Sequence, residues 1–121
     1  MTALRVLVVE DEPTIASLLL EMLRDEGFEV QHAADGVDAL ELLHTWLPNA
    51  ILLDLTLPRL DGWGFRAAQR DLPEPLCSVP VIVMSGVRYT DRLDTLDAAA
   101  VIPKPFDIEE LIATLKATTG G

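Results

Sequence analysis

The stretch from Arg5 to Pro13 reads RVLVVEDEP, a largely apolar run that ends in three acids and a proline. Short runs rich in valine and leucine, without alternating polar residues, are typical of strands buried on both faces of a parallel sheet. Downstream, apolar side chains recur at helical spacing before Gly27, at Ile15, Leu18, Leu19, Met22 and Leu23. This opening therefore predicts a strand, an acidic turn and a helix with one face against a sheet.

The same alternation of short apolar runs and helical stretches recurs along the rest of the chain. Further strands are predicted at residues 28–33, 50–53, 81–84 and 100–102. A second helix is predicted after Gly36, with Val37, Leu40, Leu43 and Leu47 on its inner side. Two shorter helices are predicted from Phe65 to Arg70 and, with a weaker pattern, from Asp91 to Leu96. A last helix is predicted near the end of the sequence, with Ile108, Leu111, Ile112 and Leu115 on its inner side. Strands that alternate with helices indicate an α/β fold with a doubly wound parallel sheet. Residues 1–119 are expected to form one domain, and residues 120–121 a tail or the start of a linker.

The composition is strongly acidic, with 20 Asp and Glu against 9 Lys and Arg and a formal net charge of −11. Nucleic acids and anionic membranes are bound through basic patches, so we expect neither as a direct partner. No apolar run approaches the length of a membrane span. Cys77 is the only cysteine, which excludes an internal disulfide and favours a reducing cytoplasm as the compartment.

Polar side chains follow four of the predicted strands at the point where each strand ends. Glu10 and Asp11 follow the first strand, Asp54 the third, Ser85 the fourth and Lys104 the fifth. Ligands of doubly wound sheets bind in the crevice at the carboxyl ends of the strands. We therefore expect two acids, a further acid, a hydroxyl and an amine to share one pocket.

Each of these residues also has a purely structural interpretation. Asp11 could cap the first helix, because Asp favours that position and Pro favours the first turn. Ser85 could simply end a strand, and Lys104 could be an exposed amine between two prolines. Asp54 is explained less well in this way, because a carboxylate directly after a buried strand is costly to desolvate without a partner. The coincidence of all of them at strand ends favours a site.

The charges of the expected pocket suit a metal ion. Glu10, Asp11 and Asp54 bring three negative charges and Lys104 returns one positive charge, which leaves two uncompensated. Ligands that are all oxygen indicate a hard cation, and Mg²⁺ is preferred over Zn²⁺. With that ion bound, Asp54 could act as a carboxylate nucleophile that forms an acyl phosphate. Lys104, Ser85 and the amide near Gly86 could stabilise the phosphoryl oxygens.

In this order the motifs resemble the receiver domains of two-component response regulators, which are CheY-like. The resemblance covers about residues 4–117 and rests on VLVVEDEP at 6–13, LDLTLP at 53–58 with DG at 61–62, VMSG at 83–86 and KPFDIEEL at 104–111. It implies a flavodoxin-like five-stranded parallel sheet in the order 2-1-3-4-5 with helices on both faces. It also implies a module whose chemistry is limited to its own phosphorylation and dephosphorylation, which is not an enzyme in the ordinary sense.

The resemblance assigns roles to individual residues. Asp54 would take a phosphoryl group from a phosphohistidine on a sensor histidine kinase or a histidine phosphotransfer protein. Glu10, Asp11, Asp54 and the backbone carbonyl of Thr56 would ligate Mg²⁺ directly or through water. Ser85 and Lys104 would contact the phosphoryl group, and the Lys104–Pro105 peptide would be cis. The phosphorylated domain would act on a downstream effector protein or an attached output domain, with a phosphorylation-dependent dimer as one form of output.

Three departures from the family pattern affect the output. Val101 stands where the family usually has Tyr or Phe, so the usual inward swing of an aromatic ring is missing. The stretch from Ser85 to Lys104 is shorter than usual by about one helical turn, which predicts a stunted fourth helix. Pro103 lacks a backbone donor, which an edge strand tolerates.

Two other functions stay open. A receiver-fold interaction module that works without phosphorylation would fit Val101 and the short fourth helix. An aspartate-nucleophile phosphatase is disfavoured, because Asp54-Leu55-Thr56 lacks the second acid two residues on that would serve as a general acid.

Overall fold

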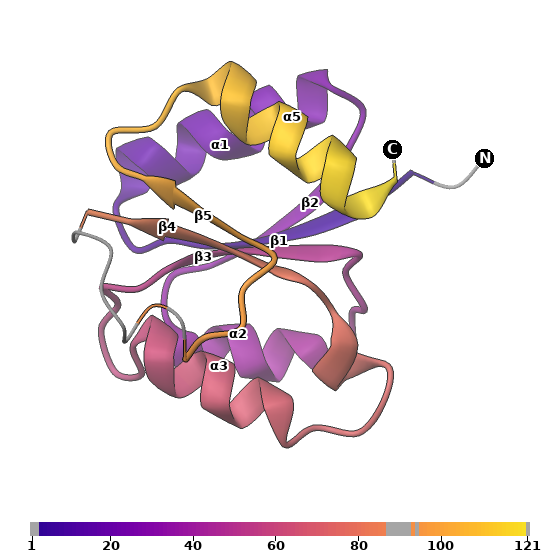
Figure 1. Cartoon of the computed structure of the whole chain (residues 1–121), viewed down its shortest axis with the longest axis vertical. Coiled ribbons are helices and arrows are strands. Elements are labelled where there is room, and N and C mark those ends of the chain that lie inside the picture. The colour runs from indigo at the N-terminus through magenta and orange to yellow at the C-terminus, as the bar shows by residue number, and fades with distance from the viewer. Residues whose placement is uncertain (1–2, 87–92, 94, 121) are drawn as a thin grey trace.

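The computed structural model describes residues 3–86, 93 and 95–120 (Figure 1). Five parallel strands form one sheet: β1 (Arg5–Val9), β2 (Glu29–Ala33), β3 (Ala50–Asp54), β4 (Val81–Ser85) and β5 (Ala100–Pro103). Their order in the sheet is β2-β1-β3-β4-β5. This order confirms the predicted flavodoxin-like, doubly wound topology.

Helices cover both faces of the sheet, as predicted. The described helices are α1 (Pro13–Asp25), α2 (Gly36–Leu43), α3 (Gly62–Arg70) and α5 (Ile108–Thr119), with a 3-10 turn at Leu76–Ser78. Figure 1 shows α1 and α5 on one side of the sheet and α2 and α3 on the other. The expected helix from Asp91 to Leu96, and with it the expected shortening of that helix, lies mostly outside the described residues.

The sheet separates two hydrophobic clusters. One contains buried residues of α1 and α5, and the other contains buried residues of α2 and α3. Residues 6–9, 50–53 and 81–84 are all buried, because each of these strands packs against helices on both of its faces. The apolar runs of these three neighbouring strands therefore end together at one edge, where the polar residues Glu10, Asp54 and Ser85 begin.

The structure corrects three details of the predicted helices. Glu12, and not Asp11, caps α1, and its carboxylate accepts from the amide of Thr14. Leu18 is 48% exposed, so the buried face of α1 runs through Ala16, Leu19 and Leu23 instead of the whole predicted stripe. The second helix ends at Leu43, which leaves Leu47 outside it and 43% exposed.

A buried arginine on α3 forms hydrogen bonds to the main chain of the turn that precedes β5. Arg66 donates to the carbonyls of Leu96 and Asp97 at 2.8 and 2.9 Å, and to Oε1 of Gln69 at 2.7 Å. Gln69 in turn donates to the carbonyls of Leu76 and Val79. Two side chains of one helix thus satisfy main-chain carbonyls on both segments that flank β4.

Candidate functional site

The predicted site residues meet at the carboxyl edge of the sheet. Glu10 directly follows β1, Asp54 ends β3, Ser85 ends β4 and Lys104 follows β5. The register pairs Asp54 with Met84 and Ser85 with Pro103, so neighbouring strands stop at the same level. Parallel pairing alone therefore brings residues from four distant segments to one place.

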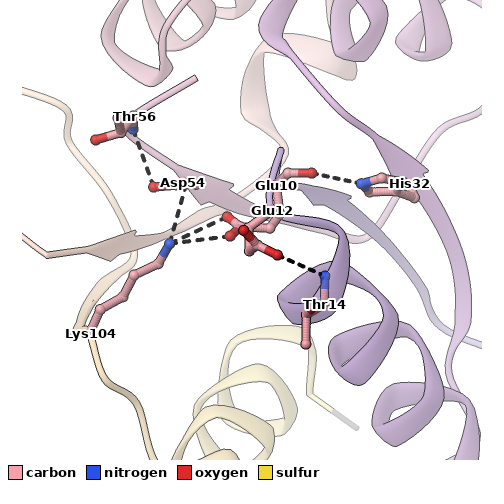
Figure 2. Close-up of polar contacts among 7 residues, drawn as sticks. All are labelled: Glu10, Glu12, Thr14, His32, Asp54, Thr56 and Lys104. Carbon is pink, nitrogen blue, oxygen red and sulfur yellow. Dashed lines mark hydrogen bonds and ion pairs between the residues drawn. The ribbon is translucent and has the colours of Figure 1, made fainter. Parts of the chain in front are cut away.

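Lys104 bridges two buried carboxylates (Figure 2). Its Nζ lies 3.2 Å from Oδ2 of Asp54 and 3.3 Å from Oε1 of Glu10. The Glu10 side chain is fully buried and that of Asp54 is 7% exposed, whereas that of Lys104 is 22% exposed. A partly solvated ammonium thus compensates charges that would be expensive to bury alone.

Glu10 is an unusual acid in this setting. Burial, followed by the hydrogen bond and the charge of Asp54, raises the pKa of Glu10 from 4.5 to about 7, although Lys104 acts in the opposite direction. The surroundings of Glu10 in the fold therefore favour a proton on its carboxyl group more than water does. A cation that binds between the acids would displace that proton.

Asp11 completes an acidic cluster with these two residues. Ligand oxygens of Glu10, Asp11 and Asp54 all lie within 4.8 Å of one another. Asp11 is exposed, so the cluster opens to solvent on its side. Three convergent carboxylates with the ammonium of Lys104 beside them are a donor set that fits a hard divalent cation such as Mg²⁺.

Thr56 and Ser85 lie beside the cluster. The amide of Thr56 donates to Oδ1 of Asp54 at 3.2 Å, so the two oxygens of this carboxylate face different partners (Figure 2). Ser85 is buried, and its carbonyl accepts from the amide of Lys104 at 2.7 Å. The Lys104–Pro105 peptide is cis, as the resemblance implies. All six residues expected at the site thus belong to one strand-end region.

Two contacts near the site were not anticipated from the sequence. His32, at the end of β2, donates from Nε2 to the main-chain carbonyl of Glu10 at 2.7 Å. Arg59, in the loop after β3, pairs with Asp35 at 2.7 Å and with Asp38 at 2.8 Å, both at the start of α2. Neither contact has a periodicity or motif that would reveal it, because each joins segments whose proximity depends on the sheet order.

The departure at Val101 is visible at the edge strand. Val101 is 37% exposed on β5, and Ile102 beside it is buried. A small aliphatic side chain thus occupies the outer position at which the family usually carries an aromatic ring.

The described residues contain an apolar hollow of about 430 Å³ next to the site, lined by Ile15, Leu18, Lys104, Pro105 and Phe106.

Known proteins are similar to this chain in sequence. The response regulator MprA of Mycobacterium sp. (strain KMS) is 37% identical over 116 residues, which cover 93% of this chain and 49% of that protein. The chain thus spans about half the length of the curated relatives that it matches.

Solved structures extend the similarity to three dimensions. The receiver domain of sensor histidine kinase PA1611 from Pseudomonas aeruginosa PAO1, which has a magnesium ion coordinated in its active site cleft, is 30% identical with a TM-score of 0.88. The match covers 99% of this chain and 100% of that one. The chemotaxis protein CheY4 of Vibrio cholerae is 26% identical with a TM-score of 0.88, over 97% and 99% of the two chains.

The family model of the response regulator receiver domain matches residues 6–116, which include every residue of the acidic cluster and Lys104. The chain therefore belongs to the response regulator receiver domains, which are signalling modules of two-component systems.

Proposed function

We propose that this receiver domain accepts a phosphoryl group on Asp54 from a phosphohistidine of a sensor histidine kinase or a histidine phosphotransfer protein. The observation that carries the proposal is the position of Lys104, whose ammonium lies 3.2 Å from Asp54 and 3.3 Å from Glu10 within a cluster of three acids. A cation in this place counters charge that develops on phosphoryl oxygens.

Contacts on both oxygens hold the carboxylate of Asp54 in position for nucleophilic attack. Its Oδ1 accepts from the amide of Thr56, and its Oδ2 faces Lys104. In the transfer, a bond forms from an Asp54 oxygen to phosphorus, and the phosphorus–nitrogen bond breaks with its electron pair leaving on the donor imidazole. Ser85, which ends the neighbouring strand, would offer its hydroxyl to a phosphoryl oxygen.

Glu10, Asp11, Asp54 and the carbonyl of Thr56 would hold Mg²⁺, directly or through water. When bound, the ion would offset the carboxylate charges and share the charge of the phosphoryl oxygens. The convergence of three carboxyl groups and the raised pKa of Glu10 support this assignment, since burying acids together is costly and a divalent cation would relieve that cost.

The phosphoryl group would change how the domain interacts with another protein. We propose a cytoplasmic module whose phosphorylated form acts on a separate effector or on an attached output domain, with dimerisation as one form of output. Leu18 and Phe106 line an apolar hollow beside Lys104, which suits a protein donor that must bring its phosphohistidine to Asp54. No helix in the described part of the chain is long and apolar enough to span a membrane.

The test is labelling with a small phosphodonor such as acetyl phosphate in the presence of Mg²⁺. We expect one acid-stable, base-labile phosphoryl group per chain, lost in Asp54→Asn and retained in Asp25→Asn, a matched change at the exposed end of α1. Label that persists in Asp54→Asn would contradict the proposal.

A constitutive interaction module is the second candidate, and it is favoured by Val101. Without an aromatic ring on β5, phosphorylation has no ring to draw inward. Under this alternative, neither acetyl phosphate nor beryllofluoride would change the spectrum of the Mg²⁺-loaded protein or its affinity for a partner. A spectral shift with both reagents would rule the alternative out.

A further inference from the structure

The loop that carries Thr56 is held by one main-chain hydrogen bond between its own ends and by another to α2. Within it, the amide of Gly62 donates to the carbonyl of Leu55 at 3.0 Å, which joins the two ends of the loop. Its outer part is attached elsewhere, since the amide of Gly36 at the start of α2 donates to the carbonyl of Leu60 at 3.1 Å. The loop thus rests on α2 through a main-chain hydrogen bond.

Arg59 adds a second attachment between the same two segments. Its Nε and Nη2 donate to the two carboxylate oxygens of Asp35 at 2.7 and 3.1 Å, and Nη2 also donates to Asp38 at 2.8 Å. Asp35 is itself held in place, because its carboxylate accepts from the amide of Asp38 and caps α2. A planar guanidinium on two oxygens of one carboxylate fixes orientation as well as distance.

The backbone of Arg59 is in an unfavourable conformation. Its φ of 62° lies in the left-handed region that residues other than glycine seldom adopt. Such conformations persist where the surroundings impose them, and they cluster at functional sites. Here the strained residue is three positions after Thr56, whose amide contacts Asp54.

Stability alone accounts poorly for this arrangement. The Arg59 side chain is 54% exposed, and ion pairs with such exposure contribute little to the free energy of unfolding. A glycine at this position would adopt the same φ without strain and would still permit the hydrogen bond between Gly36 and Leu60. What only arginine supplies is a directional connection between the loop and the capped, nearly buried Asp35.

We infer that Arg59 is a positioning residue that holds the loop of Thr56 against the start of α2 and thereby sets the affinity of the acidic cluster for Mg²⁺. The inference rests on the proposed function, since it concerns the same site. It adds a residue, with two partners on α2, that lies outside the cluster of acids and Lys104.

The sign of the effect separates positioning from simple electrostatics. Removing a positive charge near an acidic site strengthens the binding of a cation if only charge matters. Removing a positioning contact weakens that binding, because Thr56 no longer stays in place. The two explanations therefore predict opposite changes in Mg²⁺ affinity for Arg59→Gly.

The experiment compares Arg59→Gly and Arg59→Lys with Arg24→Gln, which removes an exposed charge on α1. Amide hydrogen exchange is measured at residues 56, 57, 59 and 60 of the metal-free protein, and Mg²⁺ affinity is measured by calorimetry. In Arg59→Gly we expect exchange about two- to fivefold faster and Mg²⁺ binding weaker by a similar factor. Arg59→Lys should restore less than half of the loss, because an ammonium cannot form the bidentate contact.

Arg59→Gly that exchanges like Arg24→Gln, or that binds Mg²⁺ more tightly than the wild type, would overturn the inference. Full restoration by Arg59→Lys would overturn it as well, since charge alone would then suffice. If the wild type takes no label from acetyl phosphate, the proposed function fails, and the exchange rates and Mg²⁺ affinities still decide the role of Arg59.

Discussion

The ammonium of Lys104 lies 3.3 Å from the buried carboxylate of Glu10, across a sequence separation of 94 residues. The same nitrogen lies 3.2 Å from Asp54. One partly exposed lysine therefore compensates two acids that the sheet has removed from water. An ammonium in this position lowers the cost of keeping the two acids close together out of water.

Lys104→Met should destabilise the metal-free protein at pH 8, because it keeps the bulk of the side chain and leaves two buried acids without a cation. We expect a loss of about 1–3 kcal/mol in the free energy of unfolding. Urea unfolding at pH 8 measures it. The control is Lys116→Met, which breaks an exposed pair with Glu26 and should cost under about 1 kcal/mol. Equal losses in both variants would show that the site does not need the cation.

The raised pKa of Glu10 predicts how stability depends on pH. Its value in the folded protein is about 7, against 4.5 as the reference. A raised pKa gives stability that is complete below pH 4.5 and is lost as pH rises through 7, by up to about 3 kcal/mol.

Glu10→Gln mimics the protonated acid, so it should gain stability over the metal-free wild type at pH 8 and lose that gain at pH 4.5. The difference between the two unfolding free energies, followed from pH 4.5 to 8, is the measurement. A constant difference across this range would contradict the raised pKa. The same variant should respond less than the wild type to added Mg²⁺.

Arg66→Met should be among the costly changes on α3. It leaves the buried carbonyl of Leu96, the carbonyl of Asp97 and the buried amide oxygen of Gln69 without their donor. The expected loss is about 2–4 kcal/mol by denaturant unfolding. Arg70→Met, which removes an exposed pair with Asp97, should cost under about 1 kcal/mol. Equal losses in the two variants would show that the buried hydrogen bonds of Arg66 add no more stability than an exposed ion pair does.

Gly36→Ala should strain the contact between α2 and the loop of Thr56. An added Cβ at Gly36 would overlap the carbonyl oxygen of Leu60, which is main chain and cannot turn away. We expect a loss of about 1–3 kcal/mol in thermal or urea unfolding. Within the described part of the chain no atom lies within 4 Å of a Cβ placed at Gly86, so Gly86→Ala should be within about 1 kcal/mol of the wild type. A neutral Gly36→Ala would mean that the loop can shift freely.

Much of the fold follows from local patterns. The buried runs at residues 6–9, 50–53 and 81–84 indicate strands covered on both faces, and the structure places them in the middle of the sheet. Local patterns were less reliable for helix faces and ends. Leu18 has helical spacing but lies 48% exposed, because the rotation of α1 is decided by packing against β1 and β2. Glu12, and not Asp11, is the cap because the helix begins at Pro13, and the cap is the residue directly before the first helical residue.

By itself, the sequence determined that acids, a hydroxyl and an amine follow the buried strands, because polarity and periodicity are properties of neighbouring residues. Only the tertiary structure decided that Lys104 touches both Glu10 and Asp54, that burial raises the pKa of Glu10, and that Arg59 joins its loop to Asp35. These three results depend on strand register, desolvation and the path of a loop, and each of them arises between segments that are distant along the chain.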